Sequence, residues 1–310
     1  TFGLNEFATR LTSAVAGILS IALIFWLVSR LNLRLGLIAA SIIAVNPWHI
    51  FMSRKALEAN MGLLFVLLTV STWIKLYKKP QIKWIGLFFL FCLLSYFTYP
   101  ATKVFLIIFL TFTCFTSLIQ KKWLGSVLAI IAIGIGLATF ISPQSRARGR
   151  EITLNSPTHL EQIRKDLDLE IHSAGLVNPH LPVVLVRSYS NKYLFLARDF
   201  IFKFVDHFNP AFFLSKGDDR PRFTLAKSGY LTFVEGLLII IGVIHLSRLP
   251  RQVTVPTLVW IITAAIPSSL TTENPHPVRF LLVIPALVFL AAYGVSFIKN
   301  RWLISALAVV

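Results

Sequence analysis

Four short polar stretches interrupt an otherwise apolar sequence. They are HIFMSRKALEAN (49–60), SYFTYPATK (95–103), GYLTFVE (229–235) and SSLTTENPHPVRF (268–280). The candidate binding residues in them are Arg54, Glu58, Tyr99, Lys103, Glu273, His276 and Arg279. Arginine and lysine bind phosphate oxygens and stabilise the charge of a phosphate leaving group. The set therefore predicts a site for a phosphate-bearing ligand held at the edge of a membrane.

The elements that would position these residues are apolar helices. Hydrophobic residues make up 56% of the 310 positions and the mean hydropathy is +0.74, which exceeds what one soluble core requires. Nine complete apolar runs are present, and a tenth begins at Trp302. They cover 11–29, 35–52, 57–77, 84–99, 101–119, 123–142, 229–247, 253–270 and 278–298. This pattern predicts an all-α fold, a polytopic transmembrane helical bundle.

Three regions follow from the spacing of the runs. Residues 1–142 form an N-terminal transmembrane region of about six spans, and residues 143–228 form a long extracytoplasmic segment with amphipathic helices. Residues 229–310 form a C-terminal transmembrane region of three spans and a truncated one. Because the first residue is Thr and the chain opens within a polar helix end, we expect a fragment of a longer protein.

The charge distribution predicts the orientation. The net charge is +17, and alternate connections between the runs carry twelve basic residues and no acidic one. Basic connections stay in the cytoplasm, so the excess is a topology signal and does not indicate nucleic-acid binding. All thirteen acidic residues then lie on or near the outer side, nine of them within 143–227. We expect an integral membrane protein, in the prokaryotic plasma membrane, whose active site faces outward.

The outer segment contains two predicted helices and one predicted turn. In SPTHLEQIRKDLDLEIHSAG (156–175), Thr158 and Glu161 form a capping box, and Gly175 ends the helix. Asp166 and Asp168 form a DxD pattern there, but they point in different directions on a helix, which favours a solvated face over a metal site. The stretch 191–208 has a pattern typical of a helix that lies on the membrane surface or under a lid. The composition of SKGDDRPRF (215–223) predicts a turn whose charges are solvated.

The polar stretches also allow structural interpretations. Pro47 should kink the second span. Arg54 and Glu58 are four residues apart and could pair on one helix face, whereas Lys55 and Lys103 could extend to lipid headgroups. Glu235 suits either a functional role or a buried ion pair. The functional interpretation requires Arg54, Glu58, Lys103, His276 and Arg279 to surround one outward cavity.

Several stretches together resemble a known family. They are GLNEFATRL, NPWHIFMSRKALEAN, LSYFTYPATKVF, HFNPAFFLSKGDDRPRF, GYLTFVEGLLIIIGV and IPSSLTTENPHPVRFLLVIPALVFLAAYG. In order and membrane placement they resemble the GT-C membrane glycosyltransferases, especially bacterial and archaeal relatives of the dolichyl-phosphate-mannose protein mannosyltransferases. The stretches are spread over most of the chain, except 151–189.

The resemblance implies transfer of a sugar from a polyprenyl-phosphate donor to a glycan, lipid or protein acceptor on the extracytoplasmic face. It implies that Arg54, Lys103, His276 and Arg279 contact the donor phosphate or sugar, and that Glu58 orients one of these cations. The catalytic carboxylate of such enzymes lies in the first outer loop, which would precede Thr1, so the general base is expected outside this chain. No cofactor is implied as required, and a divalent metal stays possible.

Two other classes stay open. A lipid-linked glycan ligase or polymerase has a similar layout but favours a pyrophosphate donor. A flippase or transporter would place polar groups near the bilayer midplane and use paired broken helices. In this sequence Trp260 is the main polar feature near the midplane, and the other polar groups gather at one face.

Overall fold

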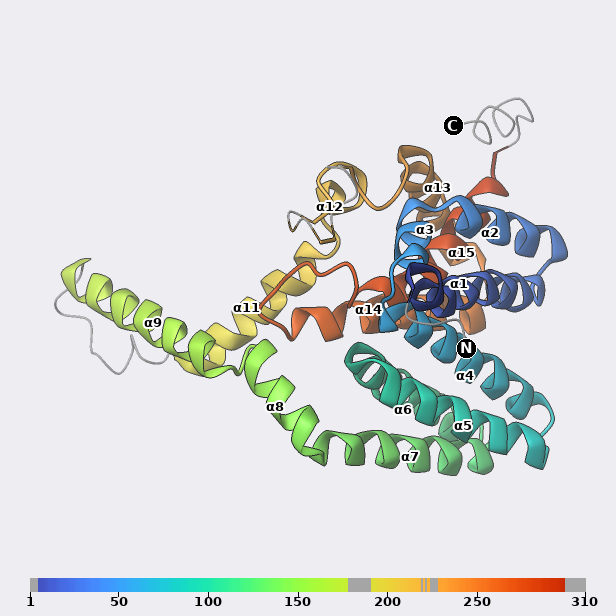
Figure 1. Cartoon of the computed structure of the whole chain (residues 1–310), viewed down its shortest axis with the longest axis horizontal. Helices are drawn as coiled ribbons and strands as arrows, with labels where there is room; N and C mark the ends of the chain where they lie inside the picture. The colour runs from blue at the N-terminus through green and yellow to red at the C-terminus, as the bar shows by residue number, and fades with distance from the viewer. Residues whose placement is uncertain (1–4, 178–190, 219, 221, 224–227, 299–310) are drawn as a thin grey trace.

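The computed structural model describes residues 5–177, 191–218, 220, 222–223 and 228–298. These residues are predominantly helical, and within them β-structure is limited to isolated bridge residues, among which Thr153 pairs with Thr271. The expected all-α fold is confirmed. The apolar helices gather in one bundle, and α8, α9 and α11 extend from one end of it (Figure 1).

The N-terminal region supplies the first half of the bundle. Its helices are α1 (Glu6–Ser29), α2 (Leu33–Val45), α3 (Pro47–Arg54), α4 (Glu58–Lys78), α5 (Ile82–Thr98), α6 (Pro100–Ile119) and α7 (Trp123–Ala138). Neighbouring helices in the sequence pack together, as α4 does with α5 and α6 with α7. Helix α1 also packs against α4, so the helix that follows α2 and α3 in the sequence lies beside the first helix again.

The C-terminal helices complete the bundle. They are α13 (Phe233–Ile244), α14 (Arg251–Ser269) and α15 (Ile284–Val295), with short 3-10 turns η2 (Leu246–Arg248) and η3 (Leu281–Val283). Helix α15 packs against α13 and α2, and α14 packs against α6. Trp260 of α14 contacts both α6 and η3. Its ring centroid is 5.0 Å from that of Phe105 in α6, and its indole N–H donates to the carbonyl of Leu282 in η3 at 2.7 Å. This midplane tryptophan therefore has a packing role.

The nine apolar runs correspond to nine helical segments. Among the described residues, five helices are long and apolar enough to span a membrane: α1, α4, α6, α14 and α7 extended by η1 (Thr139–Ile141). The bent pair α2–α3 makes a sixth, and three further apolar helices are shorter. The last run differs most from expectation because α15 begins at Ile284, with Pro285 in its first turn, and not near 278. Arg279 consequently lies in a loop and not in a span.

The second span is broken where the sequence predicts a kink. Helices α2 and α3 meet at Asn46 and Pro47 with a bend of 57°. The Asn46 side chain caps α3 by accepting from the His49 amide, and it donates to Glu235 Oε1 at 2.8 Å. Glu235 also closes a capping box with Thr232 at the start of α13. The partners of Glu235 are thus neutral, which corrects the alternative of a buried ion pair.

The two ends of the bundle differ in chemistry. At one end, the basic end, Lys75 lies over the rings of Trp26 and Trp84, and Lys122 lies over Tyr77. These contacts bring the α1–α2, α4–α5 and α6–α7 connections together, at the right of Figure 1. The opposite end, the loop end, carries the long segment 143–228 and the polar connection between α14 and η3. The charge asymmetry in the sequence therefore corresponds to two distinct ends.

The long segment contains α8 (Pro143–Ile152), α9 (Pro157–Val177), α11 (Lys192–Asp206) and α12 (Pro210–Leu214). Helix α9 begins at Pro157 and continues past Gly175, so the expected cap at Thr158 and the stop at Gly175 are wrong. Proline suits the first turn because it needs no amide donor, and a single glycine does not end a helix. Glycine at 175 is therefore an interior residue of α9.

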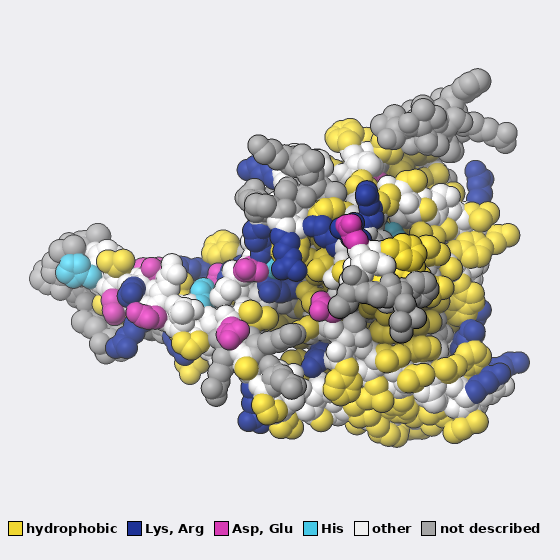
Figure 2. Space-filling model, in the orientation of Figure 1, with side chains coloured by type: hydrophobic (Ala, Val, Ile, Leu, Met, Phe, Trp, Pro, Cys, Tyr) yellow, Lys and Arg dark blue, Asp and Glu magenta, His cyan; other side chains and the backbone are white. Residues whose placement is uncertain are grey.

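Helices α9 and α11 lie side by side and form an arm with mixed surface charge (Figure 2). His159 Nε2 is 3.1 Å from Asp199, and Arg198 is 3.3 Å from Glu170. Helix α11 keeps a largely exposed apolar side, with Phe202 66% exposed. That exposure fits the predicted membrane-surface helix, which stays a prediction.

Candidate functional site

Polar side chains from three connections meet at the loop end. Asp218 and Arg220 come from the segment after α12, and Tyr99 comes from the α5–α6 junction. Glu273, His276 and Arg279 come from the connection between α14 and η3. We call these six residues the loop cluster. The α14–η3 connection is anchored by the Thr272 amide, which donates to Ile152 at 3.0 Å, and by Asn274, which donates to the Lys203 carbonyl at 2.9 Å.

Arg279 is the most enclosed cation of the cluster, with 14% of its side chain exposed. Its Nη1 donates to Thr271 Oγ1 at 2.8 Å and lies 3.7 Å from Glu273 Oε2. A further hydrogen bond joins its side chain to the Tyr99 hydroxyl. Helix α6 begins directly after Tyr99, so the start of that span holds the guanidinium in place.

Arg220 is engaged mainly by carboxylates. Its Nε lies 2.8 Å from Asp218 Oδ1, and its Nη1 lies 2.8 Å from Glu273 Oε2. Its Nη2 also donates to the Pro275 carbonyl at 3.2 Å. Charge-assisted bonds of this length are strong and directional. Arg220 therefore links the segment after α12 to the α14–η3 connection.

His276 contributes a neutral ring. Burial is the main cause that lowers its pKa to about 3, and the positive charges of Arg279 and Arg220 contribute to the same shift. Its Nε2 is 3.5 Å from Glu273 Oε2, and its ring centroid is 5.0 Å from that of Phe223. Among the described residues, its Nδ1 has no hydrogen-bond partner. With the proton on Nε2, facing Glu273, Nδ1 is a free acceptor.

Five of the seven predicted residues come together here. Glu58 lies at the start of α4, close enough to act electrostatically on the Tyr99 hydroxyl, and Tyr99 connects it to Arg279. With Glu273 and His276, these residues derive from α4, the α5–α6 junction and the α14–η3 connection. Their convergence depends on the packing of α6 against α14 and of α4 against η3.

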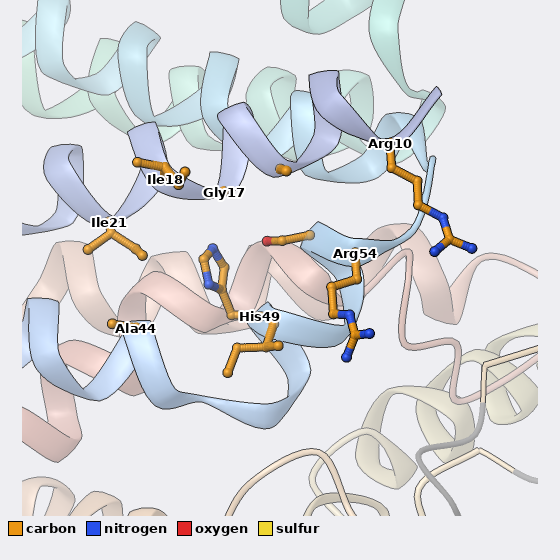
Figure 3. Close-up of a pocket in the computed structure, with 10 residues that line it drawn as sticks. Arg10, Gly17, Ile18, Ile21, Ala44, His49 and Arg54 are labelled. Atoms are coloured by element: carbon orange, nitrogen blue, oxygen red, sulfur yellow. The ribbon is translucent and has the colours of Figure 1, made fainter. Parts of the chain in front are cut away.

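Arg54 and Lys103 lie elsewhere. Arg54 is at the open end of a groove between α1 and α3, beside Arg10 (Figure 3). Lys103 Nζ donates to Ser145 Oγ at 3.2 Å and lies over the Phe140 ring. The described contacts therefore do not join these two cations to the loop cluster.

The alternative in which Arg54 pairs with Glu58 on one helix face is not found among the described residues. Helix α3 ends at Arg54 and α4 begins at Glu58, so the two side chains do not share one helix face. Lys55, in the break between the helices, donates to the Arg222 carbonyl and lies over the Phe51 ring, 4.1 Å from its centroid. It is thus tied to the segment after α12.

Sequence reasoning missed Asp218 and Arg220. The stretch SKGDDRPRF was expected to carry solvated charges, but Asp218 is only 6% exposed. The available signal was the close spacing of acid, arginine and Phe223 in a short connection, because a buried charge needs a nearby partner. Among the described residues, no three His, Cys, Asp or Glu side chains form a group that could hold a metal ion.

A comparison with known protein families finds a match in the N-terminal part of the chain. Residues 1–144 match the model of the family described as dolichyl-phosphate-mannose-protein mannosyltransferase. No curated protein gives a significant match. The matched region runs from α1 through α7 and includes Arg54, Glu58, Tyr99 and Lys103, whereas Glu273, His276 and Arg279 lie beyond it. The match confirms the resemblance to this membrane glycosyltransferase family.

Proposed function

We propose that this protein transfers a sugar from a polyprenyl-phosphate donor to an acceptor on the extracytoplasmic face of the membrane. The observation that carries the proposal is the loop cluster, which holds an enclosed arginine, Arg279, at one end of a membrane bundle. The family match over residues 1–144 supports the reaction class. The twelve basic residues in the connections at the opposite end, which contain no acidic residue, support the outward orientation of the loop cluster.

Arg279 binds the donor phosphate in this proposal. Its contact with Glu273 is long, at 3.7 Å, whereas Arg220 holds the same carboxylate at 2.8 Å. The Glu273 side chain is 55% exposed, so it can shift toward Arg220 when a phosphate arrives. Phosphate oxygens then replace Glu273 as the anionic partner of Arg279. As the sugar leaves, the guanidinium stabilises the negative charge that develops on the phosphate.

The remaining cluster residues recognise the sugar and support Arg279. Nδ1 of His276 accepts a hydrogen bond from a sugar hydroxyl, and Glu273 and Glu58 offer further acceptors. Tyr99 and Thr271 orient the guanidinium, since the hydroxyl group of each accepts a hydrogen bond from it. We assign these residues binding and charge-stabilising roles, and none of them the role of general base.

The proposal is tested by replacing Arg279 with Lys and with Ala in the full-length protein. Lysine keeps the charge but loses the planar donor geometry, so both variants should lose activity. Removing a hydrogen bond to a charged group costs about 1.5–3 kcal/mol, or roughly ten- to a hundredfold in rate. The measurement is sugar transfer from a polyprenyl-phosphate donor in detergent. Wild-type rates in both variants, with folding intact, would refute the role.

A matched control is Arg248→Lys. Arg248 is the last residue of the 3-10 turn after α13 and lies against the Phe297 ring, so it belongs to the connection between α13 and α14 and not to the loop cluster. Its replacement should leave the transfer rate within about twofold of wild type, because a surface substitution away from the site changes little. A loss equal to that of Arg279→Lys would point to a general effect of removing arginine.

A further inference from the structure

A groove of about 340 Å³ lies between α1, α2 and α3 and is separate from the loop cluster (Figure 3). Its walls are apolar and come from Ala14, Ile18 and Ile21 of α1, Ala44 of α2 and Ile50 of α3. Along α1 the lining extends from position 10 to position 21. At 1.5 Å per residue this distance is about 16 Å, enough for much of one lipid chain.

Close packing and the helix break set the shape of the groove. A Cβ atom on Gly17 would lie 2.3 Å from Ser53 Oγ, so α1 and α3 approach closely at this glycine. The 57° bend between α2 and α3 turns α3 away from the line of α2. Ile18 is 66% exposed, so the groove opens to the surface that faces lipid.

Two arginines stand at the open end of the groove. Arg10 and Arg54 lie at the same end in Figure 3, and no acidic residue lines the groove. Arg10 forms an ion pair of 2.6 Å with Glu6, in which both side chains are more than half exposed. Arg54 is exposed and has no ion pair within the described part of the chain. The mouth therefore has cationic groups available to an anion.

A buried polar atom lies in the groove wall. His49 is 2% exposed and its ring projects toward α1 (Figure 3). One ring nitrogen bonds to the Ile43 carbonyl, whereas Nε2 has no hydrogen-bond partner among the described residues. A buried polar atom without a partner costs free energy unless a ligand or water satisfies it. Because the groove walls are apolar, this atom does not decide what binds there, and the two arginines at the mouth are the observation that favours a bound anion.

We propose that the groove binds one acyl chain of an anionic phospholipid, with the lipid phosphate between Arg10 and Arg54. Two guanidinium groups match a phosphate, and the apolar walls match a single hydrocarbon chain. The polyprenyl-phosphate sugar fits less well, because among the described residues no Phe, Tyr or Trp side chain lines the groove to stack on a sugar and the nearby Glu6 carboxylate is already paired with Arg10. The bound lipid would contact both α1 and α3. It would thereby stabilise the connection between α3 and α4, which leads to Glu58.

The test measures binding of phosphatidylglycerol to the delipidated full-length protein by native mass spectrometry. Phosphatidylglycerol should bind at least about tenfold more tightly than phosphatidylcholine, and Arg54→Gln should remove most of that difference. Arg30→Gln, at the opposite end of α1, is the matched control and should bind like wild type. Equal affinity for the two lipids, or an unchanged Arg54→Gln variant, would overturn the proposal.

A second pair of variants tests the chain-binding part. Ala14→Phe fills the groove and should weaken phosphatidylglycerol binding about tenfold, whereas Val15→Phe, at an exposed neighbouring position outside the groove, should not. Similar binding by both variants would contradict the site. Displacement of phosphatidylglycerol by a lower concentration of undecaprenyl phosphate would reassign the groove to the sugar donor. Loss of sugar transfer alone would count against the proposed function and leave the lipid site standing.

Discussion

Two arginines of the loop cluster use their charge differently. Arg220 is held by Asp218 and Glu273 at hydrogen-bond distance, so its charge is neutralised within the protein. Arg279 has hydroxyl partners and only a long contact with a carboxylate. An enclosed cation with weak anionic pairing is costly and often marks a functional position. The cluster thus separates an arginine that is paired within the protein, Arg220, from one that we propose binds the donor phosphate, Arg279.

The neutral state of His276 predicts a pH dependence of stability. Its pKa is lowered from 6.5 to about 3 in the folded protein, and that of His207 to about 4, in both cases mainly by burial. Below pH 6.5 the unfolded chain takes up protons that the folded protein does not. Stability should therefore fall as the pH falls from about 6.5, by up to roughly 1.4 kcal/mol per pH unit for each histidine.

Thermal unfolding between pH 7 and pH 5 measures this effect. The midpoint of wild type should decrease over that interval, and His276→Gln should decrease less because one of the two histidines is removed. His172→Gln is the control, since His172 is exposed on α9. Identical pH profiles for wild type and His276→Gln would show that the ring does not remain neutral on folding.

The positions of polar residues in the hydropathy pattern predicted which side chains lie together better than residue spacing did. The hydropathy pattern placed Tyr99, Glu273 and Arg279 at one end of the bundle, where the structure joins them. The i to i+4 spacing of Arg54 and Glu58 gave a wrong pairing, because it assumes a continuous helix through Lys55. Interruptions of a helix, such as the one at Lys55, decide whether a side chain points into the cluster or away from it. Amino-acid composition does not predict where such interruptions occur.

Helices α13 and α15 cross at two glycines. A Cβ on Gly242 would lie 2.1 Å from the Leu290 carbonyl oxygen, and one on Gly294 would lie 2.1 Å from that of Leu238. Small residues allow such backbone contact between membrane helices. Because each helix has only 12 residues, this crossing contributes much of their packing.

Gly242→Val should destabilise the protein by forcing these helices apart. Overpacking typically costs about 1–3 kcal/mol, so the thermal unfolding midpoint should fall by several degrees. Gly134→Val on α7 is the control, because nothing lies within 4 Å of a Cβ at that position. An unchanged midpoint for Gly242→Val would mean that the two helices do not cross at this point.

The sequence predicted the kink of the second span but not the hydrogen bond that Asn46, at the kink, makes with Glu235. Pro47 alone indicates a break, and the structure shows a bend there of 57°. The hydrogen bond from Asn46 to Glu235 joins residues 189 positions apart in the chain. Local pattern gives no information about such a contact, so Glu235 could not be separated from a functional acid before the helices were placed.

The bundle has a basic end and a loop end, which predicts its orientation in the cell. We expect Lys78, Lys121 and Arg251 in the cytoplasm and residues 143–228 outside, because basic connections are retained inside. Single cysteines at Lys121 and at Lys165 of α9 can be labelled with an impermeant thiol reagent in intact cells. The reagent should modify position 165 and spare position 121. The reverse pattern would invert the membrane orientation.

The native cysteines provide the background for that experiment. Cys92 and Cys114 are buried at 1% and 9% exposure, and both lie within apolar helices. The unmodified protein should therefore label weakly, and disruption of the membrane should expose position 121 to the reagent. Failure to label position 121 even after disruption would call for another cytoplasmic site, such as Lys78.

The donor preference of the full-length protein tests the proposed reaction. Purified protein is given one sugar carried on polyprenyl monophosphate, on polyprenyl pyrophosphate or on a nucleotide, with membrane extract as the source of acceptor, and product formation is measured for each. We expect transfer from the monophosphate at a rate at least about tenfold above the others, with a loss of that transfer in Arg279→Ala. Transfer only from the pyrophosphate would indicate a glycan ligase or polymerase. Movement of the lipid across vesicles without any sugar transfer would contradict the glycosyltransferase assignment and favour a flippase.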